Sequence, residues 1–340
     1  MLHKISCKYI LDIIFEFILN KKKLNIMKYN KALINRFKIK KINFQNYVKL
    51  KEFNTKYKLN IIDFNITELN FDFHNFKNEE IKDLCVMQFN ELRKLYLNNN
   101  NIKDITGLNK IKTKKLELLD LSWNYLSNIN ELQRINFKEI KELYLRDNKI
   151  SDINVFNKVK FNKLEILDLS LNKLENINSL GKVAFNGLKI LNLSFNLISN
   201  INILEKANFK ELKELYFNHN RISDITVLAK VNYEKLEILN FESNLISDIN
   251  ILKEVNFREL KELILSSNNI SNISVLDKVK FEKLEFLNLG FNLVSDISVL
   301  EKLNFRKLKS LYLKGNKISE NSLLDIYKLG NLPLLDLSYI

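Results

Sequence analysis

The chain has 340 residues, of which 46% are hydrophobic and 28% are charged, and it contains 6 glycines and 1 proline. This composition excludes a disordered or collagenous chain, and the scarcity of glycine argues against a loop that cradles phosphate groups. The formal charge of +14 is concentrated in residues 1–60, which hold 15 Lys/Arg and 3 Asp/Glu, whereas residues 61–340 hold 39 and 37. We therefore predict a basic head, residues 1–60, and a nearly neutral body, residues 61–340.

The first predicted elements lie in the basic head. The apolar run Tyr9–Leu19 predicts an amphipathic helix, and residues 24–37 resume a helical pattern. The run is about half as long as a membrane-spanning helix, and Asp12 and Glu16 interrupt it. These acidic residues, and the lack of a small-residue cleavage site after the run, also argue against a secretory signal. We therefore expect an intracellular protein, cytoplasmic or nuclear.

The head contains the apolar pairs Ile10-Leu11, Ile14-Phe15 and Phe17-Ile18, followed by Leu24 and Tyr29-Asn30-Lys31. Short helices with these residues, ahead of a repeated region, resemble an F-box. The resemblance implies that the first two of these pairs bind a Skp-type linker of a ubiquitin ligase. One alternative is a helical cap that shields the first repeat. Another is a basic surface that attracts anionic lipid or nucleic acid, which we do not expect because no motif of a nucleic-acid-binding protein occurs.

Residues 92–331 consist of one 24-residue unit repeated ten times without an insertion. Each copy opens with the pattern L-x-x-L-x-L-x-x-N-x-I or a close variant, as in LRKLYLNNNNI at 92–102. The two leucines of the L-x-L core are expected to face inward from a short strand, and the residue between them outward. A degenerate cap at 61–91 precedes the copies, and a partial repeat at 332–340 follows them.

Two further positions recur in phase with the leucines. An asparagine follows the strand pattern in every copy, and its side-chain amide is expected to satisfy backbone groups where the chain turns. An aromatic residue recurs in eight successive copies, from Phe137 to Phe305, and is expected to fill the interior of the coil. Ser-Asp or Ser-Asn pairs, such as Ser151-Asp152, predict short 3-10 or single α-turns on the outer side.

The fixed period and the pattern are the signature of leucine-rich repeats, and they most resemble the short repeats of bacterial internalins and of the phosphatase-regulator class. We therefore predict an α/β repeat solenoid. This leucine-rich-repeat horseshoe would have a parallel concave sheet and short 3-10 or α-turns on its convex side, with a small helical segment ahead of it. The resemblance implies that the inner curved sheet binds a protein partner.

The outward strand positions form the candidate binding face. Exposed Tyr, Trp and Phe on a rigid sheet are typical anchors of protein interfaces. The alternative is that they only reflect the preference of aromatic residues for strands. The residues that we select as partner-binding are Tyr96, Trp123, Tyr144, Phe195, Tyr216, Phe291 and Tyr312. Trp123, the only tryptophan, is the strongest of these candidates.

Two kinds of copy largely alternate along the repeats. One kind offers Lys-Glu with Tyr, and the other offers an aliphatic residue with Asp or Asn. The alternation slips where the copies that begin at Leu164 and Leu188, both of the second kind, adjoin. This indicates duplication of a pair of copies, followed by the gain or loss of one copy.

We predict no enzymatic activity, no cofactor and no metal. The three histidines, His3, His74 and His219, share no metal-ligand spacing with each other or with a cysteine. No phosphate-cradling loop or nucleophile elbow occurs, and His74 is interpreted as a turn residue of the cap. The preferred hypothesis is a protein-binding scaffold that acts as an F-box-like substrate adaptor. The alternative is a phosphatase-regulator-like interaction protein with a purely structural N-terminal cap.

Overall fold

The computed structural model describes residues 41–59, 61, 64–87, 89–111, 113–135, 137–183, 185–303, 305–319 and 334–336. The chain divides into two compact units, Met1–Asp63 and Phe64–Ile340. The helices predicted over Tyr9–Leu19 and 24–37 lie outside the described residues. The same holds for the F-box-like residues Ile10, Leu11, Ile14 and Phe15.

The described part of the first unit is helix α4 (Lys41–Tyr57), which we did not predict from the sequence. Its residues Leu50, Phe53 and Tyr57 follow one another at helical spacing and are buried. The rings of Phe53 and Tyr57 meet edge to face with centroids 4.8 Å apart. The apolar stripe is visible in the sequence, but the lysines and asparagines around it obscured the pattern.

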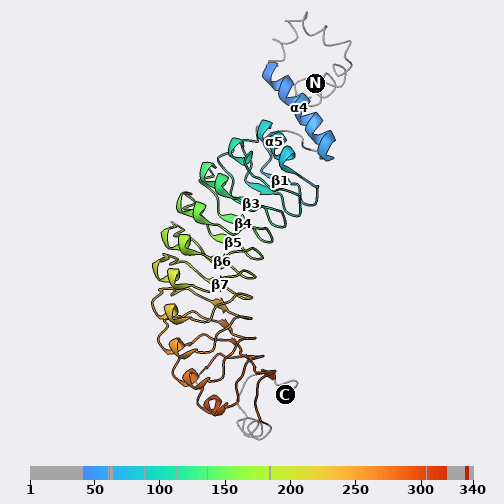
Figure 1. The fold of residues 1–340 in the computed structure, drawn as a ribbon. Coiled ribbons are helices and arrows are strands. Elements are labelled where there is room, and N and C mark those ends of the chain that lie inside the picture. The colour runs from blue at the N-terminus through green and yellow to red at the C-terminus, as the bar shows by residue number, and fades with distance from the viewer. Residues whose placement is uncertain are drawn as a thin grey trace, which may run out of the picture. The chain divides into compact units, whose positions relative to one another are not determined.

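The described strands of the second unit form one parallel sheet of twelve strands in sequence order (Figure 1). Each pairing joins equivalent positions of successive repeats, as where Leu143 lies opposite Leu167. The inward leucines therefore stack in register, which confirms the predicted repeat solenoid. The strands are β1 (Glu68–Asn70), β2 (Lys94–Tyr96), β3 (Leu118–Asp120), β4 (Glu142–Tyr144), β5 (Ile166–Asp168), β6 (Ile190–Asn192), β7 (Glu214–Tyr216), β8 (Ile238–Asn240), β9 (Glu262–Ile264), β10 (Phe286–Asn288), β11 (Ser310–Tyr312) and β12 (Leu334–Asp336).

The chain returns between strands through short 3-10 helices, which lie on the opposite side of the stack from the strands (Figure 1). The Asp152 carboxylate accepts a hydrogen bond from the backbone N–H of Asn154 at 2.8 Å and so begins one of them. The predicted short outer turns are confirmed. They are η1 (Leu108–Lys110), η2 (Asn130–Arg134), η3 (Asn154–Asn157), η4 (Asn178–Lys182), η5 (Asn202–Lys206), η6 (Thr226–Ala229), η7 (Asn250–Lys253), η8 (Ser274–Asp277) and η9 (Ser298–Lys302).

The recurring asparagine forms a ladder inside the stack, as the sequence predicts. The Asn172 Nδ2 donates to the carbonyl of Leu169 in its own turn at 3.1 Å, and to that of Leu145 in the preceding turn at 2.9 Å. Its Oδ1 accepts from the backbone N–H of Ile150 at 2.9 Å. Each ladder asparagine thus satisfies backbone groups of two turns, which would otherwise be buried without a partner.

The recurring aromatic residue fills the interior, also as predicted. It is buried from Phe137 to Phe281 and half-buried at Phe305. Phe209 and Tyr233 stack with ring centroids 6.4 Å apart, and the Tyr233 hydroxyl donates to the Leu204 carbonyl at 3.4 Å. The polar end of the single tyrosine in this column is therefore satisfied inside the coil.

The cap is a variant turn in which helix α5 (Asn78–Val86) replaces the 3-10 helix. Its residues Ile81 and Leu84 are buried and cover the end of the hydrophobic core. His74 is exposed, and its Nδ1 lies 2.7 Å from the Asp72 carbonyl oxygen, as expected of a turn residue.

Candidate protein-binding surface

Each turn leaves its strand through one residue in the left-handed conformation. At this position φ lies between 49° and 68° in eleven successive turns. Glycine adopts this conformation freely and asparagine readily, whereas a bulky side chain strains the backbone by about 1–2 kcal/mol. We call these residues the left-handed column: Phe73, Asn99, Trp123, Asp147, Leu171, Phe195, His219, Ser243, Ser267, Phe291 and Gly315.

The large aromatic residues of the left-handed column are exposed to solvent. The exposed fraction is 77% for Phe73, 48% for Trp123, 39% for Phe195 and 57% for Phe291. After Trp123, Phe195 and Phe291 the next residue is the inward-facing ladder asparagine, so these column residues point away from the core. The sequence therefore places large apolar side chains where they both strain the backbone and face water.

Two of these rings are held in place by the following turn. The Phe195 ring stacks on the His219 ring with centroids 4.0 Å apart and planes 15° apart. The Phe291 ring lies over Gly315, where an added Cβ atom would come within 2.6 Å of the Phe291 Cδ1. Both rings are therefore ordered before any partner arrives, which lowers the entropy lost on binding.

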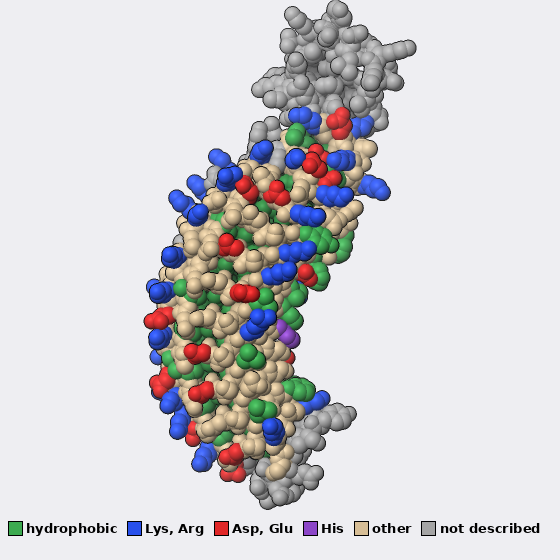
Figure 2. Space-filling view, in the orientation of Figure 1, with side chains coloured by type: hydrophobic (Ala, Val, Ile, Leu, Met, Phe, Trp, Pro, Cys, Tyr) green, Lys and Arg blue, Asp and Glu red, His purple; other side chains and the backbone are tan. Residues whose placement is uncertain are grey.

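A second exposed position follows each ladder asparagine. It holds Tyr125, Leu245 and Leu293, which are 44%, 52% and 38% exposed. Figure 2 shows hydrophobic side chains in separate patches along the right-hand border of the solenoid. We define the apolar rim as the exposed apolar residues of both positions: Phe73, Trp123, Tyr125, Phe195, Leu245, Phe291 and Leu293.

The seven residues that the sequence selected fall into two groups. Trp123, Phe195 and Phe291 belong to the apolar rim, in the turn just after the strand. The other four lie at the ends of strands on the sheet surface and are half-buried: Tyr96, Tyr144, Tyr216 and Tyr312. Sequence reasoning missed Phe73, Tyr125, Leu245 and Leu293. The signal that would have found them is their repeat position, which matches that of other exposed residues.

Two of the four strand tyrosines are hydrogen-bonded to glutamates on their own strands. The Tyr144 hydroxyl donates to the Glu142 Oε2 at 2.9 Å, and the Tyr216 hydroxyl donates to the Glu214 Oε2 at 2.8 Å. Burial, together with the adjacent carboxylate, raises the pKa of both hydroxyls, so they stay protonated. Tyr144 and Tyr216 can therefore contact a partner through ordered rings, but their protonated hydroxyls are not nucleophiles.

Two ladders of ion pairs run along the edge where the strands begin. One contains Glu117 between Arg93 and Lys141, with 2.9 Å to the Lys141 Nζ. In the other ladder the glutamate comes one repeat before its lysine, as where Glu91 pairs with Lys115 at 2.5 Å. The hydrogen bonds from Lys141 and Arg93 lower the pKa of the Glu117 carboxyl. Most charges of this edge are therefore neutralised within the solenoid.

The described residues contain no cluster of three or more His, Cys, Asp or Glu side chains that could hold a metal ion. No helix among them is long and apolar enough to cross a membrane.

Comparisons with known proteins agree with the fold. Residues 210–254 and 258–302 match the family model described as Leucine Rich repeats (2 copies). No curated protein sequence matches the chain. The structure of an internalin, InlF, from Listeria monocytogenes is 24% identical and covers 86% of this chain and 95% of its own, with a TM-score of 0.55.

Two further solved structures are similar. A leucine-rich-repeat protein of Leptospira interrogans is 21% identical and covers 84% of this chain and 86% of its own, with a TM-score of 0.61. The plant peptide hormone receptor RGFR1, solved in complex with RGF2, is 21% identical and covers 67% of this chain and 36% of its own, with a TM-score of 0.52. The chain thus contains leucine-rich repeats, and its described turns form one solenoid with the fold of leucine-rich-repeat proteins.

Proposed function

We propose that the solenoid is a scaffold that binds a protein partner through its sheet surface and the apolar rim. The observation that carries this proposal is the set of large, exposed side chains in the left-handed column. Asparagine or glycine would be better tolerated there, and the column itself contains Asn99 and Gly315. Bulky residues that cost stability and contact solvent are best explained by a gain in binding.

A similar protein supports the proposal. The plant peptide hormone receptor RGFR1, which has a similar fold, was solved in complex with RGF2. The described sheet has twelve strands, and a spacing of about 4.8 Å between strands makes its face roughly 50 Å long. This length suits a folded protein or an extended peptide.

Quantitative affinity capture tests the proposal. We would compare the full chain with the double variant Trp123→Asn and Phe195→Asn. Asparagine is chosen because it already occupies the left-handed column at Asn99. The matched control is Ser243→Asn with Ser267→Asn, at the same position of two other turns. The proposal predicts at least one protein that the full chain and the control retain and the double variant loses. Equal recovery by all three would contradict it.

For the basic head we propose the finer role of an F-box-like adaptor that acts inside the cell. The support is the set of apolar pairs at Ile10-Leu11 and Ile14-Phe15 ahead of the repeats. The test is a pull-down of a purified Skp-type linker by the full chain and by the variant Ile14→Glu with Phe15→Glu. Capture by the full chain alone supports the adaptor. No capture by either favours a structural cap and a phosphatase-regulator-like interaction protein.

A further inference from the structure

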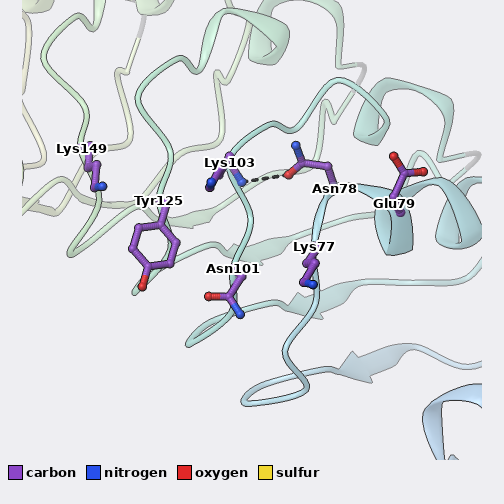
Figure 3. A pocket seen from close by; sticks show the side chains of 7 residues that line it. All are labelled: Lys77, Asn78, Glu79, Asn101, Lys103, Tyr125 and Lys149. Carbon is purple, nitrogen blue, oxygen red and sulfur yellow. Dashed lines mark hydrogen bonds between the residues drawn. The ribbon is translucent and has the colours of Figure 1, made fainter.

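A hollow of about 670 Å³ opens beside the apolar rim, near the first turns of the solenoid (Figure 3). Three lysines line it: Lys77 from the cap, Lys103 from the first repeat and Lys149 from the third. Tyr125, a residue of the apolar rim, lies between Lys103 and Lys149 in Figure 3. The hollow is thus continuous with the surface that we propose binds protein.

The backbone that carries these side chains is fixed by hydrogen bonds between turns. The N–H of Tyr125 donates to the Ile102 carbonyl at 2.9 Å, and that of Lys149 donates to the Leu126 carbonyl at 2.8 Å. The Asn78 Oδ1 accepts from the N–H of Lys103 at 2.9 Å. The lysines therefore stand at defined points around the hollow although their side chains reach into solvent.

The charges of the hollow are unbalanced, in contrast to those of the two ladders. Lys77, Lys103 and Lys149 are exposed, and within the described residues none of them forms an ion pair. The one acidic residue of the lining, Glu79, pairs with Lys82 at 3.0 Å. The Lys149 Nζ lies 4.9 Å from the centre of the Tyr125 ring, a cation–π contact that holds it at the hollow.

We infer that the hollow binds an acidic segment of a protein partner, with aspartate or glutamate side chains facing the three lysines. This inference rests on the proposed protein-binding function and specifies the chemistry of the partner. The apolar rim next to the hollow would hold an aromatic or aliphatic residue of the same segment. The other polyanion that three lysines could attract is a nucleic acid, and the test below separates the two.

The test uses the full chain and a fluorescein-labelled peptide of one phenylalanine followed by six glutamates. Its matched control peptide carries six glutamines. We expect the glutamate peptide to bind about tenfold more tightly at low salt and to lose this advantage as salt is added. Fluorescence anisotropy measures the affinity, and emission from Trp123, the only tryptophan, reports binding close to the hollow.

Variants locate the site. The double variant Lys103→Glu with Lys149→Glu should weaken binding of the glutamate peptide about tenfold. The control Lys317→Glu reverses an exposed lysine at the position of Lys149, seven repeats farther along, and should leave the affinity unchanged. Equal affinity for both peptides, an equal effect of the control, or tighter binding of a hexanucleotide would overturn the inference. The proposed function would still hold after any of these results if the full chain captured a protein that the Trp123→Asn and Phe195→Asn variant lost.

Discussion

Neighbouring residues in each turn of the solenoid have opposite effects on stability. The ladder asparagine satisfies backbone groups of two turns, whereas the residue just before it adopts the left-handed conformation. Asn172 is buried at 8% exposure, while Trp123 in an earlier turn is half exposed. The ladder position, where folding requires asparagine, thus lies next to the left-handed column, where the side chain can vary and contact a partner.

The ladder asparagine gives the first prediction. Asn172→Ala should lower the free energy of unfolding by about 3 kcal/mol, because it leaves carbonyl and N–H groups of two turns buried without a partner. Urea denaturation followed by circular dichroism measures the change. Asn157→Ala, which removes an exposed asparagine from η3, is the control and should have little effect. Equal effects of the two substitutions would contradict the role of the ladder.

The left-handed column gives the second prediction. Trp123→Asn should change the free energy of unfolding by no more than about 1 kcal/mol, because relief of backbone strain offsets the loss of a half-exposed side chain. Leu119→Ala, at a buried position of the same turn, should cost about 2–5 kcal/mol. Thermal melting of both variants tests this pair. A Trp123 variant as unstable as the Leu119 variant would show that Trp123 is structural.

The sequence predicts the interior of each turn better than its surface. Leucine spacing and the phase of the asparagine allow one packing only, so the ladder and the aromatic column are predicted correctly. Phe73 was missed because it lies in the cap, which is 26 residues and not 24 from the first copy. Residue type gives no signal at the left-handed position, since Trp, Asp, Ser and Gly all occur there.

At the scale of elements, the two ladders of ion pairs help to set which turns lie side by side. Like charges on adjacent parallel strands would repel, so alternation of Lys and Glu favours the observed register. The alternation fails between Lys189 and Lys213, adjacent members of one ladder, and both pair instead with glutamates on their other sides. This break lies one copy beyond the junction of the two adjoining copies of one kind, which begin at Leu164 and Leu188.

The ladders give the third prediction, which concerns pH. The folded state lowers the pKa of Glu117 below its ordinary value of 4.5, so its ion pairs stabilise the fold above that pH. The stabilisation is lost as the pH falls through the lowered pKa. Glu117→Gln should therefore reduce stability at pH 7 by no more than about 1 kcal/mol, because both partners are partly exposed, and should have no effect in strong acid.

Thermal melting at neutral and acidic pH checks this prediction. The control is Glu282→Gln, an exposed glutamate for which the described residues offer no ion pair. It should leave the melting temperature unchanged at both values of pH. A Glu117 variant whose deficit persists in strong acid would show that packing, not charge, explains the loss.

The elements themselves were only partly predictable. The strands and 3-10 helices follow from the repeat, because each occupies a fixed phase of the unit. Helix α5 was missed, because the cap departs from the repeat and its step to the first copy is 26 residues. Helix α4 was missed because it belongs to no repeat and its apolar residues are separated by many polar ones.

At the scale of the whole molecule, the repeat supplies a rigid support and the variation between copies supplies the binding surface. Each turn of such a solenoid contacts only its neighbours, so exposed side chains can change without disturbing the stack. The proposed partner-binding residues exploit this freedom in the second unit. The basic charge of residues 1–60 belongs to the first unit. The adaptor proposal concerns that unit alone and has its own test.

The most direct test of the central claim is site-specific photo-crosslinking in cell extract. Benzoylphenylalanine would replace Trp123 on the apolar rim in one protein, and Asn157 on the outer helix η3 in another. The account predicts a discrete protein adduct from position 123, lost when the Phe195→Asn substitution is added, and no such adduct from position 157. Adducts of the same protein from position 157 alone would show that the partner binds the opposite side and would contradict the account.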